Sequence, residues 1–192
     1  MREEDVLALF RRSGALLDGH FRLSSGLHSG GYLQCALVLQ HPRDAEALGA
    51  ALGAEVGGRH GIQTVLSPAL GGIVIGQEVA RALGVRAIFA ERQEGALTLR
   101  RGFSLEPGEK VLVVEDVLTT GGSTRETIEV ARAAGAEVVA ACAIVDRSGG
   151  TIDFGVPCRT VIQLSLPAYD PNLCPLCAQG MPVIKPGSRP GN

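Results

Sequence analysis

Short apolar runs that alternate with amphipathic segments between residues 64 and 147 restrict the fold of this chain more than any other feature. The runs are rich in valine, isoleucine and alanine, and they cover residues 64–67, 86–91, 111–116 and 137–147. Segments with the helical spacing of apolar residues follow the first and the third run. Because parallel strands need crossover connections of this kind, the pattern predicts an α/β fold in which helices cover both faces of a parallel sheet.

Smaller elements are predicted on either side of this alternation. Residues 3–12 have the spacing of an amphipathic helix, and another helix is expected to start near residues 42–44. Between them, HFRLSSGLHSGGYLQCALVL places serines and glycines among apolar pieces, which predicts a hairpin. From Pro167 onward the chain is rich in proline, glycine and asparagine, and we expect it to wrap the surface or fray. The 192 residues most simply form one domain, residues 1–192.

Composition narrows the classes of function. A hydrophobic fraction of 45% is ordinary for a globular core, and a net charge of −2 does not indicate a general nucleic-acid or membrane-surface binder. The charged N-terminal segment lacks the apolar core of a secretory signal, and no stretch reaches the roughly 18 apolar residues of a membrane span. We therefore expect a soluble cytoplasmic protein that binds neither nucleic acid nor membranes.

Two of the five cysteines, Cys174 and Cys177, form a CxxC pair. Such a pair supplies half of a zinc site, but the sequence shows no second pair and no suitably spaced histidine to complete it. A redox CxxC usually follows a strand and opens a helix, whereas this pair lies among prolines, so a catalytic role is not expected. Free structural thiols, a local disulfide and a metal shared across a dimer stay open as alternatives.

Charged residues and glycine turns follow the predicted strands. The sequence PALGG follows the first run, and the later runs end in Glu91-Arg92, Glu115-Asp116 and Asp146-Arg147. In open parallel sheets, ligands bind outside the carboxyl ends of the strands. These residues are therefore expected to gather at one edge of the sheet and to form a site there.

The segment TTGGST, residues 119–124, enters the helix predicted after the third run. Its glycines allow backbone amides to turn inward as an anion nest, and the helix N-terminus adds about half a positive charge. Ser123 or Thr124 is expected to cap the helix, and the hydroxyl side chains add further donors. The segment predicts a phosphate cradle, although not a Walker loop, because the required lysine is absent.

Glu115 and Asp116 would repel a phosphate held in this cradle if they touched it. They are expected to contact the neutral part of a phosphorylated molecule, such as sugar hydroxyls, or to stabilise positive charge that develops on a sugar ring. The alternative is an ordinary turn beside a solvated acid pair.

The stretch VLVVEDVLTTGGST, residues 111–124, resembles the signature with which type I phosphoribosyltransferases bind phosphoribosyl pyrophosphate (PRPP). The resemblance implies a Rossmann-like parallel sheet flanked by helices in residues 42–160, with a small hood formed by residues 1–40 and 160–192. It implies that the two acids hold the ribose hydroxyls and that Mg²⁺ binds mainly through PRPP, without a direct protein ligand. The implied PRPP-binding positions are Glu115, Asp116, Val117, Leu118, Thr119, Thr120, Gly121, Gly122, Ser123, Arg92, Ala69, Leu70, Gly71 and Gly72.

The segment FRLSSGLHSGGY, residues 21–32, is similar to the hood of orotate phosphoribosyltransferases. That resemblance implies transfer of ribose 5-phosphate from PRPP to orotate, giving orotidine 5′-monophosphate and pyrophosphate in pyrimidine biosynthesis. It implies orotate contacts for Ser25, Gly26, Thr119 and Arg147, and a guanidinium suits the orotate carboxylate because it can donate two parallel hydrogen bonds. Two alternatives stay open: a phosphoribosyltransferase for xanthine or hypoxanthine, and a PRPP-sensing regulator that binds nucleic acid.

The chain departs from the family pattern at several lysines. The pyrophosphate loop reads SPALGG, with Leu70 and Gly71 where many relatives have Tyr-Lys, and Ser24 stands where many have lysine. Residues 92–109 correspond to the mobile loop that, in the homodimer, reaches the neighbouring site, but this segment lacks the usual lysines. Its arginines are candidates to neutralise the leaving pyrophosphate, with solvated surface arginines as the alternative. The candidates are Arg92 for PRPP binding and Arg100 and Arg101 for catalysis.

Overall fold

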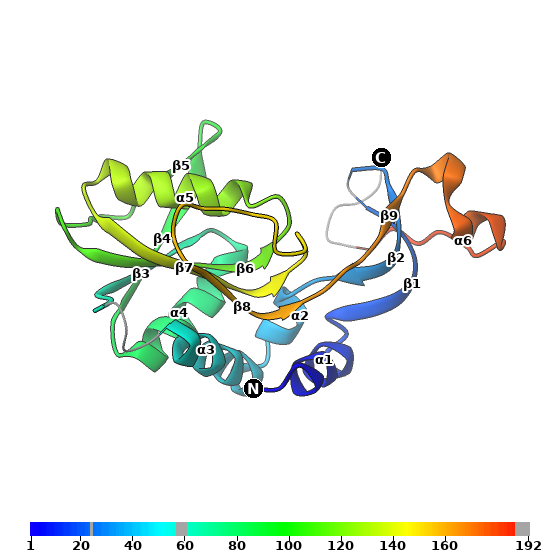
Figure 1. The fold of residues 1–192 in the computed structure, drawn as a ribbon, viewed down its shortest axis with the longest axis horizontal. Coiled ribbons are helices and arrows are strands. Elements are labelled where there is room, and N and C mark those ends of the chain that lie inside the picture. The colour runs from blue at the N-terminus through cyan, green and yellow to red at the C-terminus, as the bar shows by residue number, and fades with distance from the viewer. Residues whose placement is uncertain (24, 57–60, 187–192) are drawn as a thin grey trace.

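The computed structural model describes residues 1–23, 25–56 and 61–186, so that Ser24 and residues 187–192 of the predicted hood lie outside the described part. Figure 1 shows an α/β body and a smaller lobe, in which the first and the last segments of the chain run together. Among the described helices, none is both long and apolar enough to cross a membrane.

A six-stranded sheet forms the body, in the order β5-β4-β3-β6-β7-β8. All neighbours pair in parallel except β4 and β5, which are antiparallel. The prediction of an α/β fold with a mainly parallel sheet is therefore confirmed. The strands are β3 (Thr64–Pro68), β4 (Arg86–Gln93), β5 (Ala96–Leu99), β6 (Lys110–Leu118), β7 (Glu137–Asp146) and β8 (Cys158–Gln163).

Helices cover the two faces of this sheet, with α5 (Gly122–Ala133) on one side and α3 (Pro42–Val56) and α4 (Gly71–Leu83) on the other (Figure 1). Side chains alternate along each strand, so β6 sends Leu112 and Val114 into the core with α3 and α4, and Val111 and Val113 into the core with α5. Burial on both faces explains why the central strands are continuous apolar runs.

The predicted strand and helix positions agree with the structure for most of the body. The runs at 64–67, 86–91, 111–116 and 137–147 are strands, except that β7 ends at Asp146 and that β4 and β6 extend to Gln93 and Leu118. Helix α4 ends at Gly84, whose φ of 69° gives the left-handed C-cap expected of a glycine. Strand β8 was not predicted, because only Ile162 of its six residues is buried and its apolar signal is weak.

Residues 92–109, which the resemblance assigns to a mobile loop, begin with regular structure. Strand β4 continues to Gln93, and β5 pairs with it in an antiparallel hairpin. Glu94 and Gly95 form the turn, with φ of 50° and 92°. Positive φ at both turn residues matches the twist of a two-residue hairpin. Beyond β5, residues 100–109 have no strand or helix.

The lobe contains a second, three-stranded sheet in the order β1-β2-β9, which we call the hood sheet. The predicted hairpin is confirmed as β1 (Leu16–Arg22) and β2 (His28–Leu33), and the predicted first helix as α1 (Glu3–Arg12). Short helix α2 (Ala36–Leu39) leads back to the body. From the C-terminal segment, β9 (Ala168–Tyr169) pairs with β2, followed by η1 (Pro171–Leu173) and α6 (Pro175–Ala178). Residues 168–178 therefore form part of the lobe.

Candidate active site

The candidate site lies at the carboxyl ends of β3, β6 and β7, which are neighbours in the sheet. From β3 the chain crosses over to β4 on one side, whereas from β6 it crosses over to β7 on the other. The position between β3 and β6 is thus a topological switch point, where connecting loops diverge and leave a crevice for a ligand. The predicted gathering of PALGG, Glu115-Asp116 and Asp146-Arg147 at this edge agrees with the strand order.

Glu115 and Asp116, near the end of β6, are an acid pair without a cation partner. Glu115 is only 7% exposed, and within the described residues neither carboxylate forms an ion pair. Burial, together with the neighbouring Asp116 carboxylate, raises the pKa of Glu115 to about 9, and burial also raises the pKa of Asp116. A ligand that supplies hydroxyl donors or positive charge is therefore strongly favoured at this pair.

Two glycines at the start of α4 allow the backbone to approach the acid pair closely. A Cβ added at Gly71 would lie 2.9 Å from Oδ1 of Asp116, and one added at Gly72 would lie 2.9 Å from the carbonyl oxygen of Val114. Between them and β3, the Ala69–Leu70 peptide is cis, and the Leu70 side chain is 84% exposed. Gly71 and Gly72 are thus required by close packing, because a side chain at either position would collide with β6.

The loop between β6 and α5 has the form of an anion nest, but its cap differs from the prediction. Ser123 or Thr124 was expected as N-cap; the N-cap is Gly121, with φ of 74° and no side-chain cap hydrogen bond. A Cβ at Gly121 would lie 2.9 Å from the Phe154 ring, so glycine is also needed for space. Because the first helical bond is donated by Arg125, the amides of Gly122 and Ser123 stay available to an anion.

Arg125, which the sequence reasoning missed, holds this loop in place. Its guanidinium donates to the carbonyl oxygens of Thr120 at 3.0 Å and Asp153 at 3.1 Å, and it lies 5.3 Å from the centre of the Phe154 ring. The exposed Thr119 and Thr120 side chains remain available to a ligand. No motif distinguished Arg125 in the sequence, because its partners are carbonyl oxygens reached only in the folded chain.

Arg147 follows β7 and carries a partly buried guanidinium. Its backbone amide donates to the carbonyl oxygen of Leu118 at 2.8 Å, while its buried Nε has no hydrogen-bond partner within the described residues. Burial lowers the pKa of Arg147. Burial raises the pKa of the Cys35 thiol well above its ordinary value. The charges of Asp116 and Glu115 raise this pKa further, whereas the charge of Arg147 lowers it. Arg147 and the acid pair therefore both act electrostatically on Cys35.

Asp146 organises the turn that follows β7, a role that the sequence did not predict. Its carboxylate accepts from the amide of Ser148 at 2.7 Å, from the Ser148 hydroxyl at 2.6 Å and from the amide of Gly150 at 2.9 Å. These bonds explain how an acid that is only 5% exposed is satisfied. Asp146 is thus a structural residue that fixes the backbone next to Arg147.

Two of the three candidate arginines are paired with carboxylates. Arg101 donates to both oxygens of Glu91 at 2.7 and 2.8 Å, and these bonds hold the pKa of Glu91 below its ordinary value. Arg92 forms an ion pair with Glu126 of α5 at 3.0 Å. Arg100 is exposed and forms no ion pair in the described part of the chain. In this arrangement, Arg92 and Arg101 would have to exchange partners to bind a phosphate.

Ser25 and Gly26 lie in the turn between β1 and β2 of the hood sheet, and Gly26 has a φ of 88°. The amide of Gly26 donates to the carbonyl oxygen of Leu23 at 2.9 Å. In the described residues, no hydrogen bond connects Ser25 or Gly26 to the acid pair or to Arg147. Their predicted contact with the base stays a prediction.

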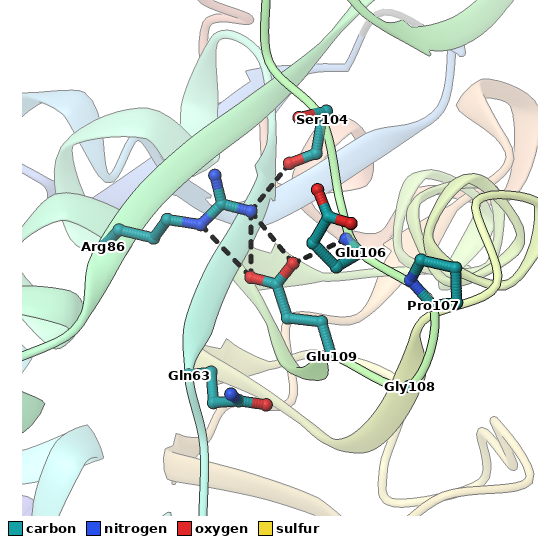
Figure 2. Close-up of a pocket in the computed structure, with 7 residues that line it drawn as sticks. All are labelled: Gln63, Arg86, Ser104, Glu106, Pro107, Gly108 and Glu109. Carbon is teal, nitrogen blue, oxygen red and sulfur yellow. Dashed lines mark hydrogen bonds and ion pairs between the residues drawn. The ribbon is translucent and has the colours of Figure 1, made fainter.

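A cavity of about 420 Å³ lies at the amino ends of β3, β4 and β6, opposite to the candidate site at the carboxyl ends (Figure 2). It is lined by Gln63, Arg86, Ser104, Glu106, Pro107, Gly108 and Glu109. Arg86 donates to both oxygens of Glu109 at 2.8 and 3.0 Å, so these two charges are paired within the protein. Arg86 also donates to the carbonyl oxygen of Ser104 at 2.6 Å, which indicates a structural role in holding residues 104–109 against the sheet.

The site and the fold define a class of protein. Residues 38–163 match the family model described as "Phosphoribosyl transferase domain", and the chain belongs to this family. The orotate phosphoribosyltransferase of Pelotomaculum thermopropionicum is 54% identical over 189 residues, covering 98% of this chain and 99% of that one. The orotate phosphoribosyltransferase of Heliobacterium modesticaldum is 55% identical over 192 residues, covering 98% of this chain and 100% of that one.

Solved structures agree with this assignment. Orotate phosphoribosyltransferase from Aeropyrum pernix aligns with a TM-score of 0.66 and 28% identity, over 83% of this chain and 93% of that one. The enzyme from Mycobacterium tuberculosis, solved in complex with PRPP, aligns with a TM-score of 0.65 and 27% identity, over 83% of this chain and 94% of that one. The family predicted from VLVVEDVLTTGGST is thus confirmed.

Proposed function

We propose that this protein is an orotate phosphoribosyltransferase, which transfers ribose 5-phosphate from PRPP to orotate and releases pyrophosphate. One observation carries the proposal: a buried acid pair that has no cation partner among the described residues adjoins an anion nest at the switch point of the sheet. The two parts suit the two ends of one ligand, because carboxylates accept from ribose hydroxyls while the amides of Gly122 and Ser123 donate to the 5′-phosphate. The relatives named above carry the same activity in their names.

Arg147 supports orotate as the base. A partly desolvated guanidinium whose Nε lacks a partner within the described residues is a strong donor toward a carboxylate. Orotate carries a carboxylate, whereas purine bases do not. The deprotonated N1 of orotate is itself the nucleophile toward C1 of PRPP, so that the protein's task is to align the two reactants and to exclude water.

Mg²⁺ fits this site as a partner of PRPP. The Asp116 carboxylate lies against the backbone at Gly71, and both acids are free of ion pairs in the described part, so the local charge and the oxygen donors suit a hard cation. When bound with PRPP, the ion neutralises the charge of the leaving pyrophosphate. The acid pair orients the ribose and favours positive charge on its ring, and the Gly71–Gly72 backbone approaches the pyrophosphate.

A panel of bases tests this function. Purified protein with PRPP and Mg²⁺ is expected to consume orotate, while adenine, hypoxanthine, xanthine and uracil stay unchanged. Reaction of a purine in place of orotate would overturn the assignment of the base but not of the family. Binding of PRPP and nucleic acid without any turnover would instead support the regulator alternative.

The free protein is expected to lose stability as pH rises from about 4.5 to about 9. Folding raises the pKa of Glu115 from 4.5 to about 9. Between these pH values the native state binds more protons than the unfolded state, so the free energy of unfolding falls as pH rises. Glu115→Gln should flatten this slope and raise the free energy of unfolding near pH 8 by on the order of 1–3 kcal/mol. Urea unfolding of both proteins at several pH values, without ligand, measures the effect. Glu129→Gln, on the exposed face of α5, is the control and should keep the wild-type slope.

We further propose that the protein is a homodimer in which residues 92–109 act in the neighbouring site. The exposure of residues 100–102 beyond β5 supports this arrangement. Arg100→Ala with Arg101→Ala in one chain, and Glu115→Gln with Asp116→Asn in another, should each abolish activity. A mixed dimer would then contain one intact site, formed by the acid pair of one chain and the loop of the other. Because about half of the dimers in an equal mixture are mixed, mixing the two variants is expected to restore about a quarter of wild-type activity. If the loop serves its own site, the mixture will stay inactive.

A further inference from the structure

We propose that the hood sheet contains a structural zinc site formed by His20, His28, Cys174 and Cys177. The ligand atoms of these four side chains all lie within 4.8 Å of one another. The expectation that no histidine completes the CxxC pair is therefore wrong. The missing ligands come from the N-terminal hairpin, which is more than 140 residues away along the chain: Cys177 and His28 are 149 residues apart.

The distances agree with tetrahedral coordination. Nε2 of His20 lies 3.0 Å from Nδ1 of His28 and 3.4 Å from Sγ of Cys174, and Sγ of Cys177 lies 3.3 Å from Nδ1 of His28 and 3.8 Å from Nε2 of His20. Zinc bonds of about 2.0–2.1 Å to nitrogen and about 2.3 Å to sulfur place tetrahedral ligands about 3.3–3.8 Å apart. Three of these four distances lie within that range, and only the His20–His28 pair is shorter; all pairs of ligand atoms lie within 4.8 Å.

A backbone contact orients one imidazole for binding. Nδ1 of His20 lies 2.9 Å from the carbonyl oxygen of Met181. A carbonyl can only accept, so Nδ1 carries the proton and Nε2 presents its lone pair to the other three side chains. Metal-binding histidines are commonly held by this kind of second contact.

The local backbone aims both histidines at the cysteines. The register of the β1–β2 pair shifts between Asp18 and Phe21, in the stretch that contains His20. A bulge of this kind turns a side chain away from the direction a regular strand would give it. On the other side, Cys174 is the N-cap of α6, and the chain turns back after it at Gly180, with φ of 72°, to bring the carbonyl of Met181 to His20.

Burial and charge favour a metal over free side chains. His20 is 1% exposed, His28 8% and Cys174 3%, and both cysteines are free thiols. Two thiolates neutralise Zn²⁺, so that the bound cluster carries no net charge, and a set of two sulfur and two nitrogen ligands is characteristic of zinc. Four protein ligands leave no open position, which makes the site structural rather than catalytic.

The site would fasten the two ends of the chain to each other. His20 and His28 flank the turn that contains Ser25 and Gly26, while the cysteines follow β9, which contributes only two residues to the hood sheet. So short a strand supplies little stability by itself. A metal that joins segments so distant in sequence stabilises the lobe strongly, because closing a long loop is costly without it.

Metal analysis of the full chain, purified with Zn²⁺ and a reductant, tests the proposal without any substrate. Wild type and the control Cys158→Ser are expected to contain one zinc per chain. The zinc content of Cys174→Ser and of Cys177→Ser should be lower by a factor of about ten or more. Removing zinc from the wild type should lower the Tm by on the order of 10 °C, and re-adding it should restore the Tm.

Cobalt titration of zinc-free wild type keeps the test decisive even if a variant fails to fold. One Co²⁺ per chain with visible bands of tetrahedral geometry and thiolate charge transfer is expected, displaced by Zn²⁺. Wild type that has reduced thiols but neither retains zinc nor shows these cobalt bands would overturn the proposal. A Cys174–Cys177 disulfide that persists in the purified, reductant-treated protein would overturn it equally.

Discussion

Replacing Glu115 by glutamine and Asp116 by asparagine together is expected to lower kcat/KM by about 10³-fold or more, while the Tm stays the same or rises. Both substitutions keep the shape of the side chains but remove the carboxylate charge that would hold the ribose hydroxyls and favour positive charge on its ring. Stability should not fall, because the folded state raises the pKa of both acids and so bears a cost for ionising them. Orotate consumption and thermal unfolding of the same preparations measure the two effects.

The matched control for this experiment removes two carboxylates outside the site. Glu129→Gln with Glu137→Gln changes exposed residues of α5 and β7, and turnover should stay within about twofold of the wild type. Equal losses in both double variants would indicate a general effect of charge. Unchanged turnover in the Glu115 and Asp116 variant would remove the acid pair from the mechanism.

Arg147→Gln is expected to raise the KM for orotate by on the order of 10²-fold, with little change in the KM for PRPP. The substitution removes a charged donor whose Nε lacks a partner among the described residues, so the loss falls on the ligand carboxylate and not on an internal ion pair. Initial rates with each substrate varied in turn separate the two constants. Arg159→Gln, an exposed arginine on β8, is the control. An equal rise in both constants would show that Arg147 does not distinguish the base.

The two predictions address different halves of the site. Under the proposed function, the acid pair and the α5 nest bind PRPP, whereas Arg147 and the hood bind the base. Loss of activity in the acid variant with normal behaviour of Arg147→Gln would therefore retain the family mechanism but reopen the choice of base.

Local pattern was sufficient to predict the body of the fold. Strands buried on both faces appear as apolar runs, and helices that cover them show helical spacing, so β3, β4, β6 and β7 could be located before any contact was known. Strand β8 and the β4–β5 hairpin could not, because β8 buries only Ile162 and the turn at Glu94 lacks the usual Asn-Gly or Asp-Gly signal.

The amino-acid sequence by itself determined the positions of β3, β4, β6 and β7, the glycine-rich nest and the adjacency of Glu115 and Asp116, since all of these depend on neighbours along the chain. Only the tertiary structure decided that Glu115 is buried with a raised pKa, that Arg92 and Arg101 are engaged by carboxylates, and that His20 and His28 meet Cys174 and Cys177. The physical reason is range. A pKa, an ion pair and a set of metal ligands each depend on the distances between groups that folding brings together, and periodicity along the chain contains no record of those distances.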